Sequence, residues 1–281
     1  MSAVTVGTAR AGVGRATVRT ALREAETRLR EAGCRTSRLD AELLVADALG
    51  ADRAALVAAP ERALSAVAAG RVAERVGRRV AREPVAYILG RRGFRHLELA
   101  VDDGVLIPRP ETELLVEVAL GVLPVGGRVH DVGTGSGAVA LALKDERPDL
   151  EVSASDVSED AVVVARANAA RLELGVEVSL ACGLPAGVYD LVVANLPYIA
   201  EDEWRALVPE IVRYEPVEAV IGGGQDGLDA IRALIGEAPH GTCLALEHAP
   251  DQAPAVRALL RGAESFRGLG GGEDVTLGHA P

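Results

Sequence analysis

Apolar residues recur three and four positions apart through the first part of the chain, a spacing typical of amphipathic helices. The pattern is clear over 21–32 and 39–48, and a further helix with arginines along it is predicted over 63–80. Pro84 ends this tract, because proline removes a backbone donor and clashes with the preceding turn. Residues 1–83 are therefore predicted to form a small helical domain that recognises a partner or covers a site.

A change of pattern follows the proline. Residues 94–101 partly alternate between apolar and polar, Asp102-Asp103-Gly104 is a turn sequence, and an apolar run resumes at 105–107. This order predicts a hairpin in a linking segment over 84–108. A helix is then predicted over 111–120, because acidic residues in its first turn suit the helix dipole.

The remainder, residues 109–281, alternates between strand-like and helical segments. Such alternation predicts an α/β domain whose parallel sheet is covered by helices on both faces. Ligands of these sheets bind beyond the carboxyl ends of the strands. The predicted strands are 128–132, 151–155, 176–180, 189–194 and 242–247, and the predicted helices are 138–144, 158–174 and 254–260.

Composition narrows the class of protein. The chain has 281 residues, of which 49% are hydrophobic, which is ample for a packed core. No apolar run is long enough to span a membrane, and Arg10 and Arg15 interrupt the N-terminal segment where a signal sequence would lie. We therefore expect a cytoplasmic protein without membrane association. Three scattered cysteines and five histidines show neither a disulfide framework nor metal-ligand spacing, so no metal is expected.

Charge is distributed unevenly along the chain. Residues 1–100 contain 18 Lys and Arg against 11 Asp and Glu, a balance of +7, whereas residues 101–281 contain 12 against 30, a balance of −18. The basic part could contact an acidic protein or a phosphate backbone, or it could be an ordinary solvated helical surface. The acidic part would repel a long polyanion, and only 2% of residues are aromatic, so stable nucleic-acid binding is not expected.

A glycine-rich loop follows the first strand of the α/β domain. Asp131 enters the turn, and Gly133-Thr134-Gly135-Ser136-Gly137 would let a nucleotide-like cofactor lie against the main chain. The spacing differs from that of typical dinucleotide sites. Asp156 ends the second strand, where it could accept hydrogen bonds from ribose hydroxyls, while Ser158 caps the following helix. Together these features favour S-adenosylmethionine over NAD.

A second motif follows a later strand. Asn195-Leu196-Pro197-Tyr198 comes directly after the apolar run 191–194. The Asn195 side chain and the carbonyl after it can hold an NH2 group. Combined with the glycine loop, this motif indicates methyl transfer to a planar amide or amine nitrogen.

These motifs and others resemble those of the HemK/PrmC family of glutamine-N5 methyltransferases. The resemblance extends over nearly the whole chain, and the motifs stand in the same order. Several long motifs in order are more specific than any one of them. The resemblance rests on 37–44, 83–90, 106–113, 131–137, 195–199, 214–216, Gly223 and 226–229.

The resemblance implies a class I S-adenosylmethionine-dependent methyltransferase with a Rossmann-like, mostly parallel seven-stranded sheet, a small N-terminal helical domain and a linking hairpin. It implies methylation of the glutamine in the Gly-Gly-Gln tip of peptide chain release factors. It also implies a set of residues that hold the cofactor: Asp131, Gly133, Thr134, Gly135, Ser136, Gly137, Asp156, Gly183 and Asn195. Asn195 and the Leu196 carbonyl would accept hydrogen bonds from the substrate NH2, Pro197 would shape the turn, and Tyr198 would pack on the amide.

The sequence departs from the family pattern at several positions. Leu196 stands where the family has proline, and Cys182 stands where an acidic residue near the adenine is usual. Glu247-His248-Ala249 differs from the usual Glu-Ile-Gly, and the terminus from residue 265 lacks the expected Asp-x-x-Gly-x-x-Arg pattern.

Two other functions remain open. Adenine-N6 methyltransferases of DNA or RNA use the same fold and a similar motif, although this acidic half lacks an evident target-reading domain. A ribosomal protein could replace the release factor as the substrate, and a third possibility is a binding protein that retains the cofactor fold without catalysis. The oligomeric state is not indicated by the sequence.

Several other residues favour structural roles. Arg109 and Glu111 are expected to form ion pairs at the domain junction, and His130 is expected in the core. Trp204 is expected to pack a loop near the active site. Gly223-Gly224-Gln225 is best explained as a turn.

Overall fold

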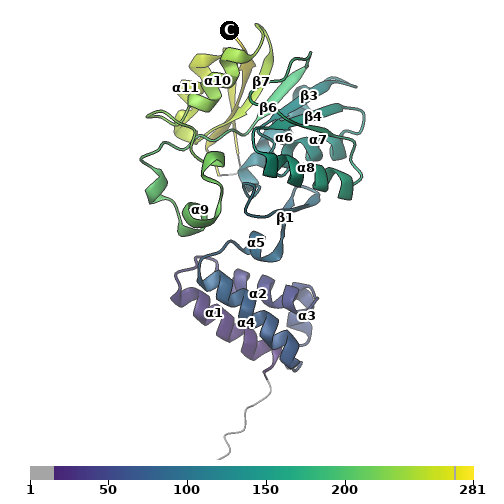
Figure 1. Ribbon diagram of the computed structural model, residues 1–281, viewed down its shortest axis with the longest axis vertical. Coiled ribbons are helices and arrows are strands. Elements are labelled where there is room, and N and C mark those ends of the chain that lie inside the picture. Colours follow the sequence, from purple (N-terminus) through teal and green to yellow (C-terminus); the bar gives the residue numbers. More distant parts are fainter. Residues whose placement is uncertain (1–15, 269) are drawn as a thin grey trace, which may run out of the picture. The chain divides into compact units, whose positions relative to one another are not determined.

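The computed structural model describes residues 16–268 and 270–281, and the chain divides into two compact units, Met1–Leu89 and Gly90–Pro281. Arg10 and Arg15, on which the argument against a signal sequence rested, lie outside the described residues. Figure 1 shows helices in the first unit, and a sheet with helices on both faces in the second.

The first unit is helical, as the spacing of apolar residues predicted. Ser65 caps its longest helix by accepting a hydrogen bond from the Ala68 N–H at 3.1 Å, which explains why this helix begins after residue 63. Arg79 and Asp40 form a buried ion pair at 2.8 Å beside the apolar core. The helices are α1 (Val18–Glu31), α2 (Ser37–Ala48), α3 (Arg53–Ala58), α4 (Ala66–Val80) and α5 (Val85–Leu89).

The predicted hairpin exists, but its turn was misplaced. Strands β1 (Arg91–Phe94) and β2 (Leu97–Ala100) pair antiparallel around Arg95 and His96, and 105–107 form no strand. Arg95 adopts a positive φ of 48°, which its residue type seldom favours. The N–H of Arg95 donates to Glu113 and its guanidinium pairs with Glu146, so tertiary contacts select this turn.

The second unit contains a seven-stranded sheet in the order β5-β4-β3-β6-β7-β9-β8. The first five strands in this order are parallel, and β9 runs antiparallel to both of its neighbours. This confirms the expected α/β class with a mostly parallel sheet. The elements are η1 (Pro110–Thr112), α6 (Glu113–Val122), β3 (Arg128–Val132), α7 (Ala138–Glu146), β4 (Glu151–Asp156), α8 (Glu159–Arg171), β5 (Glu177–Leu180), β6 (Leu191–Ala194), η2 (Trp204–Ala206), α9 (Pro209–Tyr214), η3 (Val217–Ala219), α10 (Asp229–Glu237), β7 (Cys243–Glu247), η4 (Pro250–Gln252), α11 (Ala253–Leu259), β8 (Arg261–Arg267) and β9 (Glu273–His279).

Alternate side chains of the central strands enter two different cores. On β6, Leu191 and Val193 pack with residues of α6, α7 and α8, whereas Val192 and Ala194 pack with residues of α10 and α11. The strand order reverses between β3 and β6, because β4 lies on one side of β3 and β6 on the other. Such a reversal is where open α/β sheets bind ligands.

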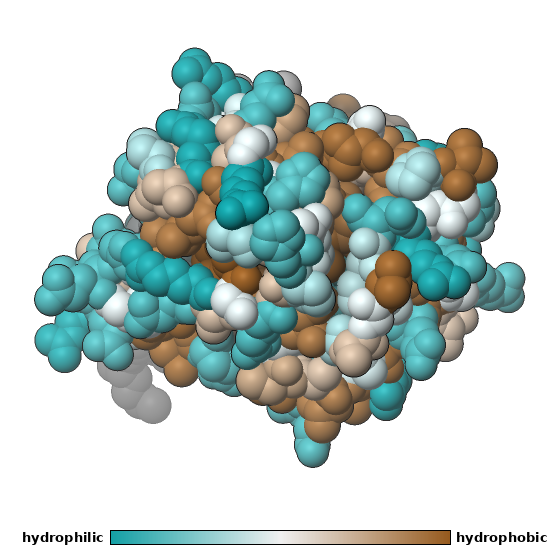
Figure 2. Space-filling model, turned by 90° about the horizontal axis from the view of Figure 1, so that it is seen from above, coloured by the Kyte–Doolittle hydropathy of each residue, from teal (hydrophilic) through white to brown (hydrophobic). Residues whose placement is uncertain are grey.

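Hydrophobic and hydrophilic side chains intermingle on the face seen from above in Figure 2. Exposed valines of the second unit, among them Val122, Val125 and Val188, are spread over different elements. Across the described parts of the chain, none of the helices has the length and apolar character needed to cross a bilayer.

Candidate active site

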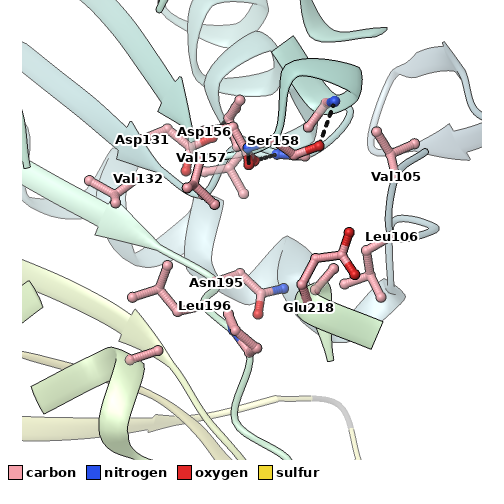
Figure 3. A pocket seen from close by; sticks show the side chains of 18 of the residues that line it. Val105, Leu106, Asp131, Val132, Asp156, Val157, Ser158, Asn195, Leu196 and Glu218 are labelled. Carbon is pink, nitrogen blue, oxygen red and sulfur yellow. Dashed lines mark hydrogen bonds between the residues drawn. The ribbon is translucent and has the colours of Figure 1, made fainter. Parts of the chain in front are cut away.

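A cavity of about 310 Å³ opens beyond the carboxyl ends of β3, β4 and β6. Its volume is at the lower end of the range for small-molecule sites. Figure 3 shows Asp156 and Asn195 on opposite sides of this cavity, with Leu106 and Glu218 along a third. The sequence-predicted residues that line it are Asp131, Gly133, Thr134, Gly135, Ser136, Asp156, Gly183, Asn195, Leu196 and Pro197.

Two predicted site residues, Gly137 and Tyr198, do not line this cavity. Gly137 begins α7 with a φ of +87°, and a Cβ there would lie 2.9 Å from Leu141 Cδ1. Its role in the structure is to turn the loop into the helix. Tyr198 is half-buried, and its carbonyl accepts a hydrogen bond from Gln252 Nε2 at 2.8 Å.

The glycine loop approaches the second motif closely. Gly133 has a φ of +72°, and a Cβ on it would lie only 2.8 Å from Leu196 Cδ2. A side chain at this position would therefore require the Leu196 side chain to shift. Gly135 also has a positive φ, but a Cβ there would meet nothing within 4 Å. The loop thus leaves open space over Gly135 for a ligand to contact the main chain.

Asp131 anchors the loop to the helix that follows it. One Asp131 carboxyl oxygen accepts hydrogen bonds from the Thr134 hydroxyl at 2.7 Å and from the Ala140 N–H at 3.2 Å. Burial raises the pKa of Asp131 to about 6, and these two donors oppose the rise. Asp131 is therefore a structural support beneath the cavity floor as well as part of its lining.

Asp156 holds backbone donors on both sides of the turn after β4. Its Oδ2 accepts from the Gly135 N–H at 2.8 Å and its Oδ1 from the Ser158 N–H at 2.9 Å. Ser158 caps α8 through the Ala161 N–H, as expected. Each carboxylate oxygen of Asp156 retains a free lone pair, so ribose hydroxyls can still donate to it.

The cavity also contains an unpaired polar atom. Ser136 Oγ is buried and has no hydrogen-bond partner within the described ranges. Buried polar atoms normally have partners, so this hydroxyl suits a polar group of a bound ligand. Together with the open space over Gly135 and the carboxylate of Asp156, it makes the loop compatible with a nucleoside cofactor.

At the second motif, Asn195 is oriented by a residue that the sequence did not single out for this role. The Asn195 Nδ2 donates to Thr112 Oγ1 at 3.0 Å. No hydrogen bond from a described residue occupies Asn195 Oδ1 or the Leu196 carbonyl. Both acceptors thus remain available to a ligand NH2.

Comparisons with known proteins match both units. A family model described as "PrmC N-terminal domain" matches residues 20–90, and one described as "Methyltransferase small domain" matches 110–221. The "Release factor glutamine methyltransferase" of Pseudomonas aeruginosa is 44% identical over 257 residues, covering 86% of this chain and 92% of the relative. The protein of the same name from Caulobacter vibrioides is 39% identical over 250 residues, covering 85% and 86%.

The chain belongs to the release factor glutamine methyltransferase family. The resemblance noted from its sequence motifs is thereby confirmed. Among solved structures, the hMettl16 catalytic domain in complex with MAT2A 3′UTR hairpin 6 is similar, with a TM-score of 0.52 and 16% identity. The likeness covers 73% of this chain and 80% of that one, and it supports the methyltransferase fold alone.

The structure compensates for the family proline missing at Leu196. The segment after it is held by its neighbours: a Cβ on Gly222 would lie 2.3 Å from the Pro197 carbonyl oxygen, and one on Gly227 would lie 2.1 Å from the Tyr198 carbonyl oxygen. The Ile199 N–H also donates to Val220. The turn is therefore constrained by close backbone packing.

A second departure concerns Cys182, which also lines the cavity. Cys182 replaces the family's acidic residue, but Glu237 at the end of α10 reaches the same place. Its Oε2 lies 1.8 Å from where a Gly183 Cβ would be, so only glycine admits this carboxylate. The sequence did not reveal Glu237, because α10 was not among the expected elements.

The remaining expectations concern supporting residues. Arg109 pairs with the buried Glu215 at 2.6 Å, as an ion-pairing role predicted, whereas Glu111 forms no ion pair with a residue that the structure describes. His130 is in the core, as expected, and bonds Ser153 and Ser155. Trp204 is half-buried on η2 and does not line the cavity, while Gly223 and Gly224 form bends with positive φ.

Proposed function

We propose that this chain methylates the side-chain nitrogen of the glutamine in the Gly-Gly-Gln tip of peptide chain release factors, using S-adenosylmethionine. One observation carries the proposal: Asn195 and Leu196, whose side-chain oxygen and carbonyl oxygen accept no hydrogen bond from a described residue, line the same cavity as the glycine loop. The family membership and the names of the relatives support it.

The acceptors supply what an amide nitrogen lacks. Its lone pair is delocalised, so the nitrogen is a poor nucleophile unless the lone pair is held in line with the methyl donor. Asn195 Oδ1 and the Leu196 carbonyl can each accept one N–H of the substrate amide. Such positioning can lower a barrier by roughly 7 to 11 kcal/mol. The same oxygens stabilise the positive charge that the nitrogen gains during transfer.

S-adenosylmethionine, when bound, supplies a methyl group on a positively charged sulfur. The residues that would hold it are Gly133, Gly135, Ser136, Asp156 and Gly183. Transfer forms a nitrogen–carbon bond while the sulfur–carbon bond breaks and leaves its electron pair on sulfur. The methylated nitrogen is strongly acidic, and its proton passes to water, so no side chain has to act as a general base.

A methylation assay tests the proposal. The chain is incubated with methyl-labelled S-adenosylmethionine and a purified release factor, and peptide mass spectrometry locates the label. We expect one methyl on the tip glutamine, and none on a release factor whose tip glutamine is replaced by alanine. Label found only on a ribosomal protein, or only on DNA or RNA, would reject the release factor as substrate. Cofactor binding without any transfer would indicate an inactive binding protein.

Asn195→Ala tests the residue that carries the proposal. We expect this variant to lose transfer almost entirely, because one of the two acceptors is removed, while its dissociation constant for S-adenosylmethionine changes by no more than several fold. Calorimetry measures that constant. The control is Glu264→Gln, an exposed residue of β8 remote from the cavity lining. Normal turnover by Asn195→Ala would exclude the proposed amide clamp, in which Asn195 Oδ1 and the Leu196 carbonyl hold the substrate amide.

The partner and compartment follow from the substrate. The helical unit, with its match to the PrmC N-terminal domain, is proposed to contribute to release factor recognition. Because release factors act on ribosomes, a release factor substrate implies a cytoplasmic enzyme.

A further inference from the structure

Glu247 and Asn195 lie at the carboxyl ends of neighbouring strands. Ala194 on β6 pairs with Leu246 on β7, and Asn195 and Glu247 are the residues that directly follow this pair. If the register continues by one residue, their Cα atoms are about 5 Å apart. Ala194 and Leu246 face the core formed with α10 and α11. Because strand side chains alternate, Asn195 and Glu247 face the other side, towards α6.

The Glu247 carboxyl is enclosed without a firm partner. Its residue is 1% exposed, and neither carboxyl oxygen makes a hydrogen bond of good geometry to a residue that the structure describes. Burial raises the pKa of Glu247 to about 8, and the Thr112 hydroxyl opposes the rise by acting as a nearby donor. A buried carboxyl of this kind is costly, and such groups concentrate at functional sites.

Other charged groups face Glu247 from the elements packed around it. Glu111 of η1 and Asp274 of β9 raise its pKa further, whereas Arg109, before η1, lowers it. Burial raises the pKa of the Tyr198 phenol, and the charge of Glu247 raises it further.

Thr112 connects this carboxyl to the proposed amide clamp. It is 3% exposed, and its Oγ1 accepts the hydrogen bond from Asn195 Nδ2. A hydroxyl has one proton to donate. Because the Thr112 oxygen already accepts from Asn195, the Thr112 proton is directed away from that amide. The Glu247 carboxyl provides an acceptor on that side.

We propose that Glu247 is a positioning residue that sets, through the Thr112 hydroxyl, which end of the Asn195 amide faces the substrate. An ionised Glu247 can only accept, so it takes the Thr112 proton and leaves Thr112 Oγ1 to accept from Asn195 Nδ2. Asn195 Oδ1 then faces the substrate NH2. A neutral Glu247 can instead donate to Thr112, whose proton is then free to bond Asn195 Oδ1 and turn the amide the wrong way.

The orientation of Asn195 can be observed without any substrate. The chain contains two asparagines, Asn168 and Asn195, so labelling asparagine amides with 15N gives two side-chain NH2 signals. We expect the Asn195 signal of the wild type to shift with pH around a midpoint near 8, and to stop titrating in Glu247→Gln. The Asn168 signal is the internal control. An Asn195 signal that does not titrate in the wild type, or that still titrates in Glu247→Gln, overturns the proposal.

Kinetics supply the second test, which rests on the proposed function. The wild-type kcat should rise with pH through about 8. The kcat of Glu247→Gln should not vary with pH and should lie about 10- to 100-fold below the wild-type plateau, a loss of the size seen when a residue that orients a metal ligand is removed. Thr112→Val should lose a similar factor, with the KM for release factor and the dissociation constant for S-adenosylmethionine nearly unchanged. Thr112→Ser should recover most of the rate.

The double variant and a matched control separate positioning from general damage. Because both groups act on one amide, Thr112→Val with Glu247→Gln should be no slower than Thr112→Val alone. Thr276→Val removes a buried hydroxyl that bonds His248 and Ser265, and it should lower the melting temperature without changing kcat. Multiplying losses in the double variant, or full activity of Thr112→Val, would refute the proposal.

The two proposals fail in different ways. If the wild type methylates no release factor, the proposed function fails, while the 15N titration still decides whether Glu247 controls the Asn195 amide. If the release factor is methylated but the titration and the pH dependence of kcat are absent, only the role of Glu247 is wrong.

Discussion

Among single side chains, Glu247 has the clearest consequence for stability. Its pKa is raised in the folded state from 4.5 to about 8. The unfolded chain therefore loses this proton at lower pH than the folded chain, so the stabilisation present below about pH 4.5 is lost as pH rises through 8. Above pH 8 the wild type carries a buried carboxylate, for which the Thr112 hydroxyl is a nearby donor.

Replacing this carboxyl by a neutral amide should separate stability from activity. We expect Glu247→Gln to match the wild type in melting temperature near pH 5 and to exceed it progressively up to pH 9. The difference in unfolding free energy should approach roughly 2 to 5 kcal/mol, because one pKa unit corresponds to about 1.4 kcal/mol. Calorimetry at several pH values measures it, with Glu264→Gln as an exposed control. A difference that does not vary with pH would contradict the buried charge.

The sequence singled out Asn195 but not its surroundings. The motif and its place after a strand suggested an acceptor for an NH2 group, and that role stays a prediction. Thr112 and Glu247 come from distant parts of the chain, and they meet Asn195 only because of strand register and the start of α6. Neither residue type indicates such a contact on its own, so only the folded chain reveals it.

Among the secondary structure elements, one buried amide links the glycine loop to its neighbours. Asn168 of α8 is fully buried, its Oδ1 accepts from the Ala100 N–H at 2.7 Å, and its Nδ2 donates to the carbonyls of Ala100 and Ser136, both at 2.9 Å. One side chain thus joins β2, α8 and the loop.

Replacing Asn168 should damage all three connections together. Asn168→Leu leaves buried backbone groups of Ala100 and Ser136 without partners, which costs about 1 to 3 kcal/mol for each group. We expect a clear fall in melting temperature and weaker S-adenosylmethionine binding, because the Ser136 carbonyl is no longer held. Thermal unfolding and calorimetry measure the two effects. Asn168→Asp is the informative companion, since it keeps the acceptor for Ala100 but loses both donated bonds. Unchanged cofactor affinity in Asn168→Leu would show that the loop is supported elsewhere.

The ease of predicting each strand reflects how it is buried. The strand at 128–132 was placed correctly at both ends, because it is bounded by a glycine pair and a glycine loop. By contrast, β8 is a polar edge strand whose pairing with β9 shifts register twice, so it has no alternating pattern to detect. The hairpin turn was missed because Arg95 takes a conformation that its residue type disfavours.

For the chain as a whole, the order of motifs was the strongest source of prediction. The helical tract followed by alternating strands and helices was enough to anticipate the α/β class, and the motif series was enough to anticipate the family. The exact division of the chain was less accessible. Pro84 was expected to begin a linker, yet the short α5 follows it directly and lies in the first unit, which ends at Leu89. A proline is compatible with a helix start, so its presence did not determine which unit would contain the helix.

The two units have separate hydrophobic cores, which predicts how the chain unfolds. One core belongs to α1–α5, and the other two surround the sheet of the second unit. We expect two unfolding transitions in calorimetry. S-adenosylhomocysteine, the product of the methyl donor, should raise the midpoint temperature of only the transition that belongs to the second unit. A ligand present at one hundred times its dissociation constant adds about 2.7 kcal/mol to the free energy of unfolding. For a unit of this size, that raises the melting temperature by about 5 to 10 °C. Residues 90–281 expressed alone should show that shifted transition by itself. A single transition that moves as a whole would show instead that the units unfold cooperatively, and a truncated unit that fails to fold would show that its core depends on the helices.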